Sequence, residues 1–149
     1  MSENEILERA RRRVENMPSR MFKSDYILNI IEENGCDLDK IHEYITRSII
    51  ETEKEIEEYE RMSDDEFLQR NQFATLTRPY TIGSLTNYMT MLFNAIPYIN
   101  SLATSSFIDY TIKRNFKGKI RKAKRVIGKL RRLSQNFKLD NVKSEGINQ

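Results

Sequence analysis

The fold is organised around the stretch from Ile112 to Phe137, whose sequence is IKRNFKGKIRKAKRVIGKLRRLSQNF. Its apolar residues recur at spacings of mostly three and four, which is the pattern of an amphipathic helix. These residues are Ile112, Phe116, Ile120, Ala123, Ile127, Leu130 and Phe137. At about 100° per residue they fall within an arc of roughly 140°, and every basic residue of the stretch except Lys119 lies outside it. The sequence therefore predicts one helix with an apolar face and a cationic face.

The cationic face predicts a surface that binds a polyanion. We expect this surface to consist of Lys113, Arg114, Lys117, Arg121, Lys122, Lys124, Arg125, Lys129, Arg131 and Arg132. Because lysine and arginine displace counterions from phosphates, nucleic acid, either DNA or RNA, is the partner that this face predicts first. Most contacts would be to the backbone, so the sequence specificity would be low. Phe116 and Phe137 belong to the apolar stripe, so we expect no aromatic side chain among the basic ones that could stack on bases.

Two other partners suit the same helix. One is an acidic protein surface, in which case the chain is a structural or assembly subunit of a larger complex, such as a viral one, and can form a homo-oligomer. The other is an anionic membrane surface, with the apolar face of the helix buried in it. Pairing within the chain, with an acidic helix over 38–62, is expected to be incomplete because four arginines lie near the middle of the polar face. These are Arg114, Arg121, Arg125 and Arg132.

Charge is distributed unevenly along the 149 residues. Residues 1–78 contain 12 Lys and Arg against 19 Asp and Glu, whereas 79–149 contain 13 against 3. Such asymmetry is typical of contact with nucleic acid or a membrane surface. A single cysteine and the lack of a signal-like or long apolar run indicate a cytoplasmic protein without a transmembrane segment, in the host cytoplasm or a virion if viral. Abundant Ile and Asn suggest a bacterial or viral genome rich in AT.

The acidic half predicts four helices with recognisable ends. Their expected ranges are 2–16, 24–34, 38–62 and 64–72. Ser2 and Ser63 each precede a Glu by three residues, which is the capping-box pattern. Gly35 is expected in a left-handed conformation that ends the second helix, and Asp37 is expected to cap the third. A helix-turn-helix DNA reader is disfavoured here because acidic side chains would face the phosphates, so we predict a helical hairpin.

The middle of the chain, from Pro79 to Ile108, contains no charged residue. Residues 75–83, with Pro79, predict the main linker. Beyond it we expect a helical hairpin that Pro97 interrupts, either buried or serving as a protein interface. The residues predicted for such an interface are Tyr88, Met91, Tyr98 and Phe107. The hairpin and the basic helix, 79–137, are expected to belong to the same domain as 1–78, and 138–149 to form a flexible tail.

Motifs for catalysis are lacking in the sequence. His42 and Cys36 are the only residues of their kinds, and the HExxH zinc motif is not completed because Thr46 follows at the fifth position. The acidic run Asp64, Asp65 and Glu66 is better explained by helix capping than by metal binding. We therefore predict an all-α bundle of five to seven helices that is not an enzyme and binds neither cofactor nor metal. Its expected function is binding, through the basic helix.

Overall fold

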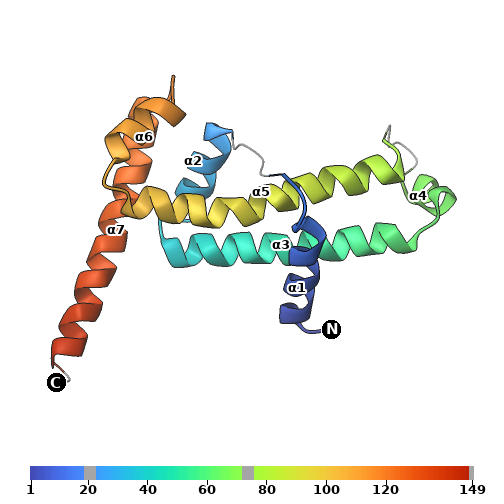
Figure 1. Cartoon of the computed structure of the whole chain (residues 1–149), viewed down its shortest axis with the longest axis horizontal. Helices are drawn as coiled ribbons and strands as arrows, with labels where there is room; N and C mark the ends of the chain where they lie inside the picture. The colour runs from blue at the N-terminus through green and yellow to red at the C-terminus, as the bar shows by residue number, and fades with distance from the viewer. Residues whose placement is uncertain (19–22, 72–75, 148–149) are drawn as a thin grey trace. The chain divides into compact units, whose positions relative to one another are not determined.

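The computed structural model describes residues 1–18, 23–71 and 76–147, and the side chains as far as Gln135. This part of the chain consists of seven α-helices and contains no strand, which confirms the predicted all-α class (Figure 1). The helices are α1 (Glu3–Val14), α2 (Ser24–Glu33), α3 (Leu38–Arg61), α4 (Asp64–Arg70), α5 (Arg78–Thr104), α6 (Ile108–Asn115) and α7 (Ile120–Ile147).

Local capping explains where most of these helices begin. The Ser2 hydroxyl accepts a hydrogen bond from the Glu5 amide, and the Ser63 hydroxyl accepts one from the Glu66 amide, as the capping boxes predicted. Asp37 Oδ1 accepts from the Asp39 amide at 2.9 Å at the start of α3. The helix α2 begins at Ser24 as predicted, but its N-cap, Lys23, makes no side-chain hydrogen bond.

The turn between α2 and α3 uses two consecutive left-handed residues. Gly35 has a φ of 67°, as predicted, and Cys36 follows with a φ of 57°. The Cys36 amide donates to the Ile31 carbonyl at 2.8 Å, which satisfies an end carbonyl of α2 in the manner of a Schellman motif. A non-glycine residue in this region is disfavoured sterically. Burial of the Cys36 side chain accompanies the unfavourable backbone conformation.

The chain divides into two compact units, each of which takes residues from both halves of the sequence. Unit 1 comprises Met1–Met21 and Ile45–Asn94, and unit 2 comprises Phe22–Tyr44 and Ala95–Gln149. The helices α3 and α5 contribute residues to both units. In unit 1 the fully buried side chains include Ile49 and Ile56 of α3, with Met89 and Leu92 of α5.

The core of unit 2 is built around the predicted apolar stripe. Both α2 and α6 contact α7, and Figure 1 shows α6 beside the first turns of α7. Within the stripe, Ile112, Phe116, Ala123, Ile127 and Leu130 are buried. Ile120 is half-buried, and the Phe137 side chain lies outside the described residues. The amphipathic pattern therefore identified the buried face correctly.

The predicted single helix over 112–137 is wrong, because the chain forms two helices with a turn between them. α6 ends at Asn115, α7 begins at Ile120, and Gly118 between them has a φ of 80°. The Lys119 amide donates to the Phe116 carbonyl at 2.9 Å across this turn. Phe116 itself is buried, so the turn retains the apolar contact while reversing α6 onto α7. Apolar spacing of three and four continues through the turn, which is why periodicity alone missed it.

The central segment also differs from the prediction of a linker followed by a hairpin. α5 begins already at Arg78, where the Thr77 hydroxyl accepts from the Tyr80 amide at 3.4 Å. Pro79 thus lies in the first helical turn, where a missing amide hydrogen costs no intrahelical bond. α5 then continues past Pro97 to Thr104 as one helix, with Pro97 at the surface. Residue 72 of the fourth predicted helix and residue 75 of the predicted linker lie outside the described residues.

The predicted flexible tail over 138–149 is helical as far as Ile147. Its last two residues lie outside the described part of the chain. The sequence signal for an end at Phe137 was the loss of apolar periodicity, but helix propensity does not require an apolar stripe.

Candidate functional site

The segment 108–135, which includes α6 and the described side chains of α7, carries eleven Lys and Arg residues and one acidic residue, Asp109. The structure divides these cations into three groups according to what they contact. One group pairs with α2, a second donates to uncharged oxygen atoms, and a third points outward without a described partner. The groups decide which part of the predicted polyanion surface is available.

The first group is neutralised by the acidic residues of α2. Lys119 forms an ion pair with Asp25, and Arg125 pairs with Glu32 at 3.0 Å between Nη1 and Oε2. Both pairs are partly exposed, so each stabilises the fold by about 1 kcal/mol or less. The carboxylates that pair with Lys119 and Arg125 thus come from α2 and not from the acidic helix α3, which the sequence indicated as the partner within the chain.

The second group is held by neutral acceptors. Lys122 Nζ donates to Asn29 Oδ1 at 3.1 Å, Arg131 donates to the Leu102 carbonyl at 2.8 Å, and Arg114 Nη1 donates to the Tyr110 hydroxyl at 3.4 Å. Leu102 lies in the last turn of α5, where carbonyls lack helical partners and a cation is favourable. Arg131 therefore helps to end α5, which the sequence did not reveal.

The third group forms what we call the outward cationic surface. Its members are Lys113, Lys117, Arg121, Lys124, Lys129 and Arg132. All six side chains are exposed, and none makes a hydrogen bond or ion pair with another described residue. Arg121 and Arg132 lie on the same side of α7, because eleven residues are close to three full helical turns. This side is opposite the buried stripe, so the two arginines lie at the centre of the surface.

A groove between α6 and α7 adjoins this surface. It encloses about 380 Å³ and is lined on the α7 side by Lys124, Gly128, Arg131 and Arg132. Ile108 and Asp109 belong to the α6 side, so one carboxylate faces three cations. A Cβ added at Gly128 would meet no atom within 4 Å, so the glycine leaves open space beside the cations and is not required by internal packing.

The N-terminal arginine run is explained by an ion cluster in unit 1. Glu53 of α3 has a side chain that is 0% exposed, and it accepts from Arg9 Nε at 2.9 Å and from Arg13 Nε at 2.7 Å. Arg13 also pairs with Glu60 at 2.8 Å, and Arg9 with Glu57. The hydrogen bond to Glu53 is the main cause that raises the pKa of Arg13. Arg9 and Arg13 therefore face α3 and are neutralised there.

A signal for this cluster was present in the sequence. Glu53 lies between Ile49 and Ile56 on the apolar side of α3, where a carboxylate requires a partner. Arg9 and Arg13 are four residues apart and so lie on one side of α1. Matching the two patterns would have predicted the contact.

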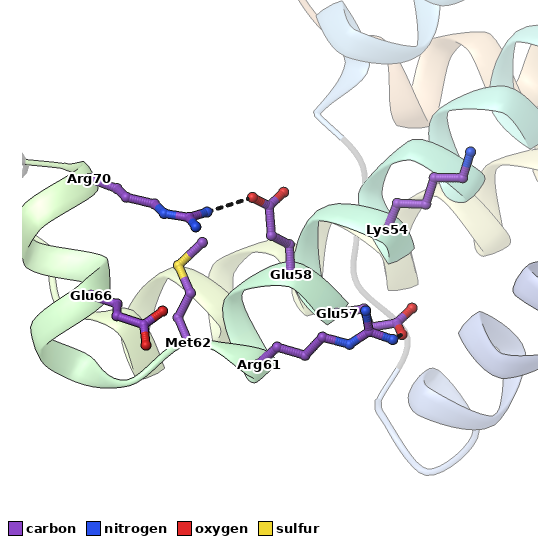
Figure 2. Close-up of a pocket in the computed structure, with 7 residues that line it drawn as sticks. All are labelled: Lys54, Glu57, Glu58, Arg61, Met62, Glu66 and Arg70. Atoms are coloured by element: carbon purple, nitrogen blue, oxygen red, sulfur yellow. Dashed lines mark hydrogen bonds and ion pairs between the residues drawn. The ribbon is translucent and has the colours of Figure 1, made fainter.

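A second hollow, in unit 1, is lined by equal numbers of positively and negatively charged side chains. Its volume is about 320 Å³, and its lining includes Lys54, Arg61 and Arg70 with Glu57, Glu58 and Glu66. Figure 2 shows Arg70 of α4 extending toward Glu58 of α3, where Nη1 and Oε1 are 3.0 Å apart. Three carboxylates balance three cations, so this hollow concentrates neither charge.

His42 and Cys36 are occupied in separate ways. The His42 ring donates from Nε2 to Asn100 Oδ1 at 2.7 Å, and His42 lines a hollow of about 400 Å³ with Thr104 and Leu133. Burial raises the pKa of the Cys36 thiol, which disfavours the thiolate. In the described residues there is no group of three or more His, Cys, Asp or Glu that could hold a metal ion.

The four residues predicted for a protein interface differ in exposure. Tyr88, Met91 and Tyr98 are half-buried, and Tyr98 accepts a hydrogen bond from the Asn115 side chain at 3.2 Å. Phe107 is 75% exposed. Phe107 is therefore accessible to a partner, as an interface residue must be. It lies at the N-cap of α6 and not in the predicted hairpin.

Comparison of the chain with protein-family models, with curated proteins and with solved structures finds no match. Each helix in the described residues is too short or too polar to cross a membrane. The outward cationic surface is the feature of the described chain with the most unbalanced chemistry, and it supplies the argument for function.

Proposed function

We propose that this protein binds nucleic acid through the outward cationic surface of α6 and α7, mainly by contacts to phosphates. The observation that carries the proposal is the set of six exposed cations that no described carboxylate neutralises. A folded helix holds such cations at fixed spacing, whereas a disordered basic tail does not. Release of condensed counterions from the phosphates then supplies the binding free energy.

The dimensions of the surface suit a phosphate backbone. Arg121 and Arg132 are separated by roughly 16 Å along the helix axis, at 1.5 Å per residue. The groove beside them adds Lys124 and the open position at Gly128, where a backbone can approach closely. Exposed aliphatic side chains are scarce here, which favours a polar, charged partner over an apolar one.

The test compares charge removal on this surface with equal charge removal elsewhere. One variant carries Arg121→Gln and Arg132→Gln, and the control carries Lys40→Gln and Lys54→Gln, two exposed lysines of α3. Binding of labelled oligonucleotides, single-stranded and duplex, is measured by fluorescence anisotropy between 50 and 250 mM salt. The slope of log K against log salt should decrease by about 1.4 for a single strand and about 1.8 for a duplex, and the affinity at low salt should fall.

The control should bind with nearly unchanged slope. Equal weakening in both variants would mean that only net charge matters and would overturn the proposed site. No binding at 50 mM salt to either oligonucleotide would overturn the proposed function, and stable oligomers under those conditions would favour an assembly subunit instead.

A further inference from the structure

The break at Gly118 gives α6 an outward face of its own, which a continuous helix starting at Ile112 would not have. Ile112 and the half-buried Ile108 form the inner side of α6. The opposite side carries Tyr110, Lys113 and Arg114, with Phe107 at the N-cap, all within an arc of roughly 120° at 100° per residue. Phe107 is 75% exposed and Tyr110 is 63% exposed.

Aromatic and basic side chains are therefore interleaved on this face, which we call the α6 aromatic face. Arg114 Nη1 donates to the Tyr110 hydroxyl at 3.4 Å, so the guanidinium lies beside the phenol. The sequence predicted no such interleaving, because the predicted basic helix began after Tyr110. Its two phenylalanines, Phe116 and Phe137, belonged to the apolar stripe. Phe116 is indeed buried.

Two exposed rings with neighbouring cations have the chemistry of a platform for unpaired bases. A base stacks on an aromatic ring through its π-face, and this requires that the base is not already stacked within a duplex. Cations beside the rings meet the phosphates of the same nucleotides. A protein partner would more typically meet large aromatic residues in a surface poor in lysine.

We infer that the α6 aromatic face binds single-stranded nucleic acid, with bases stacked on Tyr110 and Phe107 and phosphates bound by Lys113 and Arg114. The inference rests on the proposed function, in which the cations of α6 and α7 bind phosphates. It adds a preference for single strands over duplex, and it implies little discrimination among bases because every base has a π-face.

The direct test replaces both rings and leaves the charges in place. The probes are labelled dT12 and a 12-base-pair duplex, and the variant carries Phe107→Leu and Tyr110→Leu. Each stacked base contributes about fivefold to about a hundredfold, so affinity for dT12 should fall by at least about fivefold, and by more if both rings stack a base. Affinity for the duplex should change by less than about twofold. Tyr80→Leu in α5 is the matched control, because Tyr80 is 61% exposed and should leave both affinities unchanged.

A second measurement does not depend on affinity. The chain has no tryptophan, so Tyr110→Trp introduces a single indole at the platform. Stacking of a base should quench its fluorescence on addition of dT12, with little change on addition of the duplex. Trp at position 80 serves as the reference, through Tyr80→Trp.

The outcomes separate the two proposals. In one outcome, Arg121→Gln with Arg132→Gln weakens binding, but loss of the two rings weakens the binding of duplex and dT12 equally or weakens neither. The stacking platform is then wrong, and the proposed function stands. If neither probe binds the unaltered protein, both fail. Binding to anionic vesicles that requires the rings, without nucleic-acid binding, would identify the face as a membrane contact and also overturn the inference.

Discussion

The buried carboxylate of Glu53 offers the sharpest test of the fold, through the substitution Glu53→Gln. The change preserves the shape of the side chain but removes its charge. Two guanidinium groups, those of Arg9 and Arg13, then face an amide that can accept fewer hydrogen bonds and carries no compensating charge.

The expected loss follows from the contacts and the exposure of the three side chains. Removing one partner of a buried ion pair typically destabilises by about 3 to 5 kcal/mol. The side chains of Arg9 and Arg13 are 27% and 19% exposed, so water partly hydrates them. They also keep Glu57 and Glu60 as partners. We therefore expect the lower end, about 3 kcal/mol, which is a large share of the 5 to 15 kcal/mol that is typical of a domain.

The measurement is the free energy of unfolding from urea titration, followed by circular dichroism at 222 nm. Glu51→Gln is the matched control, because Glu51 is an exposed carboxylate on the same helix and its loss should change stability by less than about 0.5 kcal/mol. The triple variant Arg9→Met, Arg13→Met and Glu53→Met should recover most of the loss, because it removes the uncompensated charges together.

Two results would refute this reasoning. A loss below about 1 kcal/mol for Glu53→Gln would mean that the carboxylate is solvated in the folded protein. A triple variant no more stable than Glu53→Gln would show that the orphaned guanidinium groups are not the source of the loss.

Two further predictions concern single residues. Gly83→Ala should stabilise the protein by about 1 kcal/mol, because Gly83 is an exposed helical residue with open space at its Cβ position, whereas Gly118→Ala, at a φ of 80°, should destabilise it by about 1 to 2 kcal/mol. Thermal unfolding of the two variants should shift in opposite directions, and a shared direction would contradict the turn at Gly118. The thiol of Cys36, whose pKa is raised first by burial from a usual value of 9.0, should react with Ellman's reagent at pH 8 far more slowly in the folded protein than in urea. A folded thiol that reacts as fast as the unfolded one would contradict its burial. Because the pKa of Cys36 is higher in the folded state, its contribution to stability is complete below pH 9 and is lost as the pH rises above that value.

Local features of the sequence were sufficient for the four helices of the N-terminal half, α1 to α4, and for the buried face of the C-terminal segment. A cap such as Ser63 acts on an amide three residues away, and the apolar stripe of α7 repeats within one helix. Both are short-range effects, so they can be recognised without knowing the fold. The same reasoning identified the left-handed Gly35 and the predominance of cations after Ile112.

Interruptions of helices were less predictable, because the local cost of breaking or continuing a helix competes with packing elsewhere. Pro97 disfavours a helix by about 3 kcal/mol relative to Ala, yet α5 continues through it, with Ile99 buried in the next turn. Gly118 disfavours a helix by only about 1 kcal/mol, yet the chain turns there. The burial of Phe116 beside that turn belongs to the tertiary structure.

By itself, the sequence determined that this is a helical protein whose C-terminal third concentrates positive charge on an amphipathic segment. Only the tertiary structure decided which charges are available. Arg9 and Arg13 meet Glu53 from 44 and 40 residues away, and Arg125 meets Glu32, whereas Arg121 has no described partner. The physical reason is that an ion pair depends on the distance between two side chains in space. Spacing along one helix specifies the face on which a charge lies but not what that face meets.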